Sequence, residues 1–453
     1  MRSVFSVILA GLAIGLAPAA RGDAPVFPFR IESTTLPNGL RVLSIPFDSP
    51  GIIAYYTVVR TGSRNEVEEG LTGFAHFFEH MMFRGTKRYS AEAYNAALKS
   101  LGADSNAFTS DDLTCYHMTV PASALAKAVE LEADRFQNLE YDEPAFQKEA
   151  RAVLGEYNKS ASSPYLLLNE TMQEKAYTKH TYRHTTIGFL DDVKAMPTRY
   201  AYSKVFFDRW YRPENCTVIV AGDVKHAELV ELAKKHYGAW KRGSNDVVIP
   251  EEPEQTSERE AKLGWPLPTL PIRYLGWHIP ASSRNLADHA ALGALAQAYF
   301  GATSPLYKSL VIEEQKVVTL GADAESKRDP GLFTILVRAR SAADLPEIQA
   351  RIDRTLADAA TTPLDAAKLA AVKSHLRYAF AASLESADAV ALAASYAIAV
   401  SDEPDGMNRL HEAYAALTPA DLQRVAAKYF AKTNRTVVTL ETTPAQSDKE
   451  SNK

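Results

Sequence analysis

The sequence predicts an α+β fold made of two similar domains, each a mostly antiparallel sheet packed with helices. Three observations indicate this class. Strand-like hairpins are followed by blocks of helices, and this order disfavours a doubly wound parallel sheet. A similar order of elements returns in the second half of the chain, as expected for an internal repeat. The length of 453 residues also exceeds what one ordinary hydrophobic core serves.

The first half opens with a predicted hairpin, because Pro37-Asn38-Gly39 in "TTLPNGLRVLSIPF" supplies turn-forming residues. A strand "IIAYYTVVRTGS" follows, and a helical pattern starts at Leu71. The next helix begins at Ser90 and ends at Gly102, after which "SNAFTSDDLTCYHMTVP" alternates like a strand. The remaining elements of this half are expected from Ser123 to about Leu139, from Asp142 onward, in "NCTVIVAGDV" and in "HAELVELAKKHYGAW".

Between Gly243 and Pro268 the sequence becomes acidic and proline-containing, which predicts a linker. The second half is expected to contain, in order, strand "PIRYLGWHIP", helices "LADHAALGALAQAYFG" and "SPLYKSLVIEEQ", strands "VVTLGADAES" and "GLFTILVRAR", two helices, and strand "NRTVVTLET". The predicted division is therefore an N-terminal domain over residues 24–243, a linker over 244–268, a homologous C-terminal domain over 269–445, and a disordered tail over 446–453.

Residues 1–19 are predicted to be a signal peptide. Arg2 provides a positive start, Val4 to Leu16 is an apolar run, and Ala17-Pro18-Ala19 is a small-residue cleavage pattern. A retained anchor is disfavoured because the run falls short of the roughly 20 apolar residues that span a bilayer. We therefore expect cleavage after Ala19 and a mature chain, without a membrane span, in a periplasm or outside the cell.

Composition narrows the class of partners. Hydrophobic residues make up 46% and charged residues 23%, which is typical of a globular protein. The net charge of -5 provides no broad basic field, so nucleic acid is not an expected partner. The two cysteines, Cys115 and Cys216, each sit in a strand-like run; buried thiols are favoured slightly over a disulfide, and the spacing leaves both open.

The stretch "GFAHFFEHMMFRGT" predicts a metal centre. On a helix, His76 and His80 lie one turn apart on one face, so both imidazoles can converge on one ion. Glu79, next to His80, is placed to act on a water molecule, and H-x-x-E-H is the inverted form of a zinc-peptidase motif. The alternative is a core helix with two hydrogen-bonded histidines. Because the surrounding residues are nearly all apolar, a buried glutamate between two histidines favours the metal.

A third ligand is expected from the segment "DEPAFQKEARAVLGEYNKS", where Glu149 and Glu156 are seven residues apart and share a helix face. By pattern alone, a solvated acidic face is the more usual explanation of these two residues. Zinc suits the nitrogen and oxygen ligands, although the spacing does not exclude cobalt or manganese.

The chain resembles the pitrilysin and mitochondrial processing peptidase family of inverted-motif zinc peptidases. The resemblance rests on "LTGFAHFFEHMMFRGT", "LGADSNAFTSDDLTCY", "LGEY", "HTYRHTTIG" and "YRPENCTVIVAGD". It implies a Zn²⁺-dependent endopeptidase that acts on extended or unfolded peptides. It also assigns the roles of the site residues: His76, His80 and Glu156 as ligands, Glu79 as general base, and Glu149 as a supporting acidic residue.

The resemblance further implies that "SNAFTSDD" is an exposed edge strand that pairs with the substrate backbone, with Asn106, Ala107 and Phe108 as candidates. The alternative is an ordinary strand with Phe108 in the core. His180 and His184 are also four residues apart, but their loop-like setting and the lack of a carboxylate in the right relation to them favour a structural role.

The second half lacks the motif, since "LGALAQAYFG" contains neither histidine nor glutamate. The family often contributes an arginine and a tyrosine to substrate binding from this half, but "SLVIEEQKVVTLGA" has Val311, Ile312, Val318 and Thr319 where such a pair would fall. We therefore expect a dimer, with a homologous partner subunit supplying the arginine and tyrosine as one hypothesis. The competing functions are a non-catalytic peptide-binding or assembly subunit and a zinc-stabilised scaffold, which would normally need four protein ligands.

Overall fold

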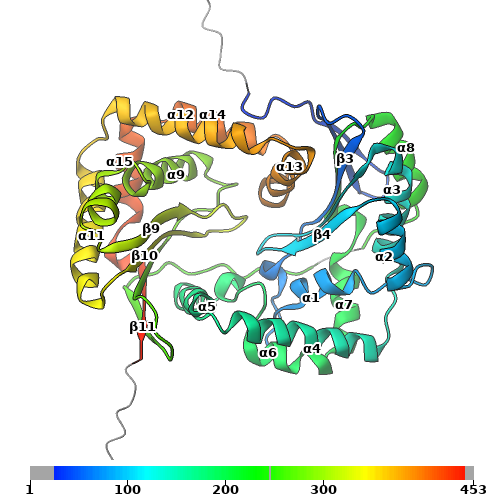
Figure 1. The fold of residues 1–453 in the computed structure, drawn as a ribbon, viewed down its shortest axis with the longest axis horizontal. Helices are drawn as coiled ribbons and strands as arrows, with labels where there is room; N and C mark the ends of the chain where they lie inside the picture. The colour runs from blue at the N-terminus through cyan, green and yellow to red at the C-terminus, as the bar shows by residue number, and fades with distance from the viewer. Residues whose placement is uncertain (1–24, 244–245, 444–453) are drawn as a thin grey trace, which may run out of the picture.

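The computed structural model describes residues 25–243 and 246–443, which form two sheets with helices packed around them (Figure 1). The expected signal peptide of residues 1–19 and the tail of residues 446–453 lie outside the described residues. Within the described part of the chain, no helix has the length and apolarity needed to cross a membrane.

The first half contains a six-stranded sheet in the order β1-β2-β6-β3-β5-β4. Its strands are β1 (Glu32–Thr35), β2 (Arg41–Pro46), β3 (Ile52–Val59), β4 (Asp104–Thr109), β5 (Thr114–Pro121) and β6 (Cys216–Gly222). Its helices are α1 (Phe74–Met81), α2 (Ala91–Ser100), α3 (Leu125–Asn138), α4 (Glu143–Ser160), α5 (Pro164–Ala176), α6 (Leu190–Ala195), α7 (Tyr200–Trp210) and α8 (His226–Tyr237).

The second half contains a five-stranded sheet in the order β7-β11-β8-β10-β9. Its strands are β7 (Arg259–Trp265), β8 (Ile272–His278), β9 (Val317–Ala324), β10 (Leu332–Ala339) and β11 (Arg435–Thr442). Its helices are α9 (Leu286–Phe300), α10 (Pro305–Tyr307), the π-helix η6 (Lys308–Glu313), α11 (Leu345–Thr361), α12 (Ala366–Ser383), α13 (Ala387–Ser401), α14 (Gly406–Ala416) and α15 (Pro419–Tyr429).

The two sheets repeat one topology. In the first, β2 and β6 are parallel and every other pair is antiparallel; in the second, β7 and β11 are the parallel pair. Strands β2, β6, β3, β5 and β4 therefore correspond in order to β7, β11, β8, β10 and β9. The predicted α+β class, with two similar and mostly antiparallel sheets packed with helices, is confirmed.

The repeat explains one correction to the predicted linker. Residues 244–268 were expected to connect the halves, but Arg259–Trp265 within them form strand β7. This strand is the counterpart of β2 and completes the edge of the second sheet. Its alternating side chains are only partly buried, as suits an edge strand, so the segment lacks the apolar run by which strands are usually recognised.

Two further predictions were too coarse. The segment "SNAFTSDDLTCYHMTVP" was expected to be one strand, but it forms the hairpin β4–β5, whose turn is closed by a hydrogen bond from Ser110 N to Leu113 O (2.8 Å). Two helices were expected before the last strand, but the structure has five α-helices there, α11 to α15. Capping residues divide the helical run, among them Asp365, Ser386 and the left-handed Asp402.

One helix from each half packs on the sheet of the other half. Val390, Ala394 and Ile398 of α13 pack on the face of the first sheet that α1 leaves open. In return, Leu168 and Met172 of α5 pack on the face of the second sheet opposite to the one that α9, α11 and α15 cover. Helix α13, "ADAVALAASYAIAVS", is apolar almost all round, which suits burial on more than one side. This exchange joins the two halves through apolar contacts.

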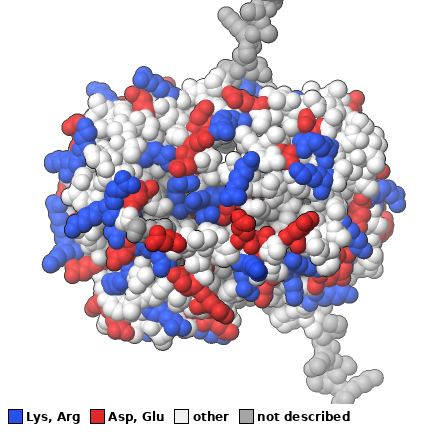
Figure 2. Space-filling model, turned by 180° about the vertical axis from the view of Figure 1, so that it is seen from behind, with Lys and Arg blue, Asp and Glu red and all other residues white. Residues whose placement is uncertain are grey.

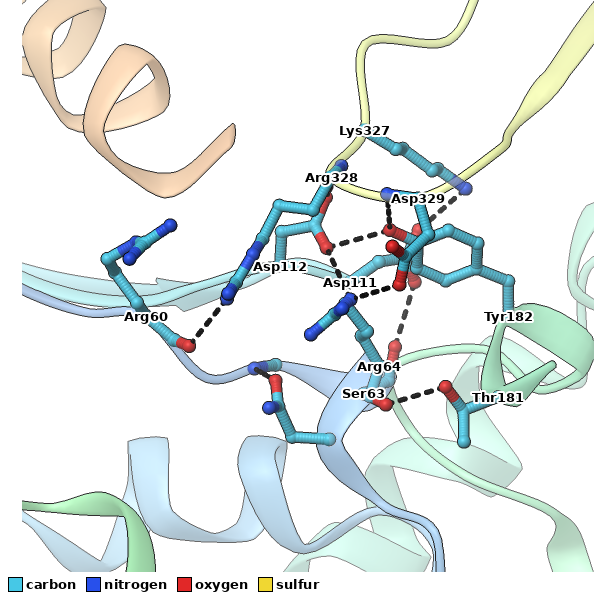
Figure 3. A network of polar contacts seen from close by, with 12 residues as sticks. Arg60, Ser63, Arg64, Asp111, Asp112, Thr181, Tyr182, Lys327, Arg328 and Asp329 are labelled. Atoms are coloured by element: carbon cyan, nitrogen blue, oxygen red, sulfur yellow. Dashed lines mark hydrogen bonds and ion pairs between the residues drawn. The ribbon is translucent and has the colours of Figure 1, made fainter. Parts of the chain in front are cut away.

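A network of polar contacts joins the halves at a second place (Figure 3). The loop between β9 and β10 reaches the first half, where Lys327 Nζ lies 2.8 Å from the carboxylate of Asp111. Asp329 accepts a hydrogen bond from Arg64 Nε (2.6 Å), and Arg328 N donates to Asp112 (3.0 Å). Asp111 and Asp112 form the turn of the β4–β5 hairpin, so the second half fixes this turn.

We expect Lys327→Met to destabilise the fold by about 3–5 kcal/mol, because removal of one partner leaves a buried carboxylate uncompensated. Lys327 lies between Asp111 and Glu325 and is only 12% exposed. Denaturant unfolding of the purified chain measures the loss. The matched control is Lys194→Met, which breaks the ion pair between Lys194 and Asp191. The side chains of these two residues are 55% and 93% exposed. The control should cost at most about 1 kcal/mol; equal losses in the two variants would contradict a special role for the buried pair.

Both cysteines are buried free thiols. Cys115 belongs to the core between the first sheet and α13, and Cys216 to the core on the other face of that sheet. Burial raises the pKa of each thiol well above its ordinary value, so neither is poised for reaction. On the face shown in Figure 2, acidic and basic side chains are intermixed, in keeping with the absence of a broad basic field in the sequence.

Candidate metal centre and peptide-binding strand

Helix α1 carries the predicted histidines and is fixed at its first turn. Gly73 begins it in a left-handed conformation (φ 90°), and a side chain at this position would come within 2.6 Å of Ile187 O. The carboxylate of Glu66 accepts hydrogen bonds from the N–H groups of Gly73 and Ala75, at 2.7 Å each. This carboxylate satisfies donors that have no partner within the helix, at the end where the helix dipole favours negative charge.

The structure brings His76, His80 and Glu156 together. Glu156 Oε2 of helix α4 lies 3.6 Å from His76 Nε2 and 3.4 Å from His80 Nε2. Two atoms bound to one tetrahedral Zn²⁺ at about 2.0–2.1 Å are themselves about 3.4 Å apart. Glu156 therefore lies at ligand spacing from both imidazoles, and the ligand atoms of the three residues all lie within 4.8 Å of one another. Among residues 25–243 and 246–443, they are the one group of three histidine, cysteine or acidic residues so arranged.

The protonation of the site also suits a cation. Burial, followed by the charge of His80, lowers the pKa of His76 to about 4, which keeps the imidazole in the neutral form that binds metals. His76 Nδ1 is buried and has no hydrogen-bond partner among the described residues. Glu156 is 45% exposed, so the group is open to solvent on one side. A metal site with three protein ligands and an open position is the catalytic type.

Glu149 orients one of the histidines. It is 3% exposed, and its Oε1 lies 2.9 Å from Nδ1 of His80. A hydrogen bond at Nδ1 leaves Nε2 facing Glu156. Arg84 contacts the other oxygen of Glu149 at 2.5 Å. Burial alone would raise the pKa of Glu149, but the hydrogen bonds from His80 and Arg84 lower it, and the contact with Glu149 raises the pKa of His80.

Glu79 lies between the histidines and the edge strand. Its Oε2 accepts a hydrogen bond from Thr109 Oγ1 at 2.7 Å, which ties α1 to the end of β4. Burial raises the pKa of this carboxyl group, while Thr109 acts in the opposite direction. A carboxylate that is desolvated and oriented in this way, beside a metal site, is suited to accept and return a proton.

Strand β4 holds the three candidate substrate-binding residues and is the outermost strand of the first sheet. It pairs with β5 alone, so its other edge presents unpaired backbone groups. Asn106 is exposed, whereas Ala107 is buried on the α1 side and Phe108 packs against α13. The core contact of Phe108 is what the ordinary-strand alternative expects, and the edge of β4 is free of strand pairing; substrate binding by Asn106, Ala107 and Phe108 stays a prediction.

Sequence patterns missed three residues of this region: Thr109, Arg84 and Glu66. Arg84 stands four residues after His80, a spacing that could have indicated a shared partner. Thr109 directly follows the predicted strand residues, but its contact with Glu79 depends on how the strand meets the helix. Glu66 is ten residues before His76, and nothing in the local pattern indicates that it caps α1.

The rival pair of histidines does not converge. His180 Nε2 lies 3.0 Å from Asp329, within the polar network between the halves. His184 Nδ1 lies 3.7 Å from Glu66, behind the first turn of α1. In the second half, Ile312 and Val318 are 60% and 38% exposed, at the positions where the sequence lacks an arginine and a tyrosine.

Comparison with known proteins gives two family matches. The family described as Insulinase (Peptidase family M16) matches residues 53–188, a range that holds the three candidate ligands and Glu79. The family described as Peptidase M16 inactive domain matches residues 203–376.

Single proteins and solved structures agree with these matches. The zinc protease PqqE of Helicobacter pylori is 30% identical over 417 residues, which cover 90% of this chain and 92% of that protein. The crystal structure of a protease from Helicobacter pylori superposes with a TM-score of 0.83 at 31% identity, covering 91% of this chain and 99% of that one. The periplasmic protease PqqL from Escherichia coli shares the fold, with a TM-score of 0.75 at 20% identity, over 91% of this chain and 48% of its own.

Proposed function

Because the chain belongs to peptidase family M16, we propose that it is a zinc-dependent endopeptidase that hydrolyses extended peptides or unfolded polypeptide segments. The observation that carries the proposal is the convergence of His76, His80 and Glu156 at 3.4 and 3.6 Å, with Glu79 beside them. The relative named a zinc protease supports Zn²⁺ as the cofactor.

Each residue of the site has its own role in the proposed reaction. His76, His80 and Glu156 would hold a Zn²⁺ ion, which would supply polarisation of a water molecule and of the substrate carbonyl group. Glu79 takes a proton from the attacking water and returns it to the leaving amine. Thr109 orients Glu79, and Glu149 orients His80 through Nδ1, which leaves Nε2 toward Glu156. The free edge of β4 pairs with the peptide backbone and holds it extended along the site.

The assembly and location follow as parts of the same proposal. The chain matches about half of the longer Escherichia coli protease, so a second homologous subunit would supply the other half. Such a partner, identical or related, can also supply the arginine and tyrosine that the second half lacks. Export after removal of residues 1–19 is consistent with the periplasmic location in the name of that protein. We place the domain boundary in the segment between α8 and β7.

Chelation tests the proposed activity. We expect the purified chain to contain one zinc per active site and to cleave unstructured fluorogenic peptides. A chelator should abolish cleavage, and added Zn²⁺ should restore it. Without the metal, neither the attacking water molecule nor the substrate carbonyl is polarised. Cleavage that persists after complete metal removal would contradict the proposal. A fully zinc-loaded chain that binds peptides without cleaving them would favour the non-catalytic subunit.

A further inference from the structure

A cavity of about 460 Å³ lies among helices α9, α12, α13 and α14 of the second half. Its volume is in the range of pockets that bind small ligands or side chains. Most of its wall is apolar, with Leu286, Phe380, Leu392, Tyr396 and Met407 among the lining residues. The cavity adjoins the core between the first sheet and α13, to which Met407 belongs, and it holds none of the residues of the proposed metal centre.

The cavity carries no unpaired charge. Its two charged lining residues, Glu403 and Arg409, form an ion pair with each other. His289 also lines it and is 4% exposed, and burial lowers the pKa of this imidazole to about 4, so it is neutral. His289 Nδ1 is buried without a hydrogen-bond partner among the described residues. Because most of the wall is apolar and its two charges are paired with each other, a mainly apolar, uncharged group is the occupant that the lining favours.

One wall of the cavity touches the edge strand. Tyr396 lines the cavity and stacks on Phe108 of β4, with ring centroids 5.9 Å apart and planes at 27°. Tyr396 is 45% exposed, so this side is accessible. Ala107 and Thr109 face α1 and the proposed metal site, whereas Phe108, between them, faces α13. One face of β4 is therefore directed toward the proposed metal site, and the other toward α13 and the cavity.

A peptide that pairs with the edge of β4 would alternate in the same way. Its strand would lie about 4.8 Å from β4, and its successive side chains would point to opposite faces of the extended sheet. Side chains on one face point toward the metal centre. Those on the other face run beside Phe108 toward Tyr396 and the cavity behind it. Because of this alternation, only every second residue of the peptide can reach the cavity.

We propose that this cavity receives a bulky apolar side chain of the peptide bound along β4, and so makes the enzyme prefer an apolar residue at one position of the bound segment. This inference rests on the proposed function, because it takes the peptide to lie on β4. It assigns a role in specificity to the half of the chain that lacks the metal motif.

Cavity filling tests the inference. Ala393→Phe places a ring in the cavity from α13, at a position that is not among the fully buried residues of that helix. The matched control is Ala357→Phe, on the exposed face of α11. Cleavage is measured with peptides in which one position at a time changes from alanine to phenylalanine, leucine, lysine or glutamate. We expect the wild type and the control to prefer phenylalanine or leucine at one position by about 10-fold or more in kcat/KM.

In Ala393→Phe this preference should fall to within about twofold, while the all-alanine peptide is cleaved as by the wild type. The same preference in wild type and Ala393→Phe, or no preference at any position, would overturn the inference. If Ala393→Phe does not fold, Ala389→Phe, one turn earlier on the same wall, takes its place.

A binding measurement separates this inference from the proposed activity. Fluorescence anisotropy compares labelled phenylalanine and alanine peptides on the same proteins without requiring turnover. If the wild type cleaves nothing, the peptidase proposal fails, but tighter binding of the phenylalanine peptide that Ala393→Phe removes still supports the pocket. Equal binding of both peptides overturns it. The inference is also overturned if an apolar dye occupies the cavity and peptides do not displace it, because the occupant would then be a small molecule.

Discussion

Glu79→Gln should reduce kcat by about 10²- to 10⁴-fold, the usual contribution of a general base, while the chain keeps its zinc. The amide has the size of the carboxylate and can still accept the hydrogen bond from Thr109. It cannot take a proton from water at neutral pH. Glu79 is not one of the three side chains proposed as ligands, so the metal affinity should change little. Peptide cleavage under saturating substrate and metal analysis of the same samples measure both effects.

The control for this substitution is Glu69→Gln, ten residues earlier at an exposed position. It alters the charge of the chain in the same way and should leave kcat within about twofold of the wild type, as expected for a surface site without contacts. Full activity of zinc-loaded Glu79→Gln would remove the assignment of the base. Loss of zinc from the variant would instead indicate that Glu79 contributes to metal binding.

The two histidines on α1 were predictable from the local sequence, because their relative position depends only on the geometry of one helix. A spacing of four residues places His76 and His80 on one side of a helix wherever that helix lies. The third ligand is different. Glu149 and Glu156 share a face of α4 by the same rule, but only the packing of α4 against α1 decides which of them meets the imidazole Nε2 atoms. The resemblance to a family provided that choice before the structure did.

Contacts between the halves were outside the reach of sequence patterns. The hydrogen bond from Arg328 to Asp112 joins residues 216 positions apart. Periodicity predicts that α13 is apolar on most sides, but it cannot tell that one side covers the sheet of the first half and another lines a cavity. Strand β7 was assigned to the linker for a related reason: an edge strand needs few buried residues, and only the repeat of the two sheets identifies it.

Glu156→Gln tests the site from the side of the metal. The amide removes the only carboxylate among the three convergent side chains, and the two imidazoles of His76 and His80 remain. Loss of an outer-shell partner such as Glu149 typically costs about 10- to 100-fold in metal affinity. Loss of a direct ligand should cost more than that, and activity should fall in parallel at limiting zinc. Competition with a chromophoric chelator measures the dissociation constant.

The comparison that decides the assignment uses Glu143→Gln, an exposed acidic position at the start of the same helix. It removes the same charge from α4 but should keep the wild-type zinc affinity, because no candidate ligand lies near it. Thermal unfolding gives an independent readout: zinc stabilises a chain that binds it by RT ln(1 + [Zn]/Kd), so the zinc-dependent rise in Tm should shrink in Glu156→Gln alone. An unchanged zinc affinity in Glu156→Gln would show that the carboxylate of α4 is not a ligand, and the three-residue centre would then have to be abandoned.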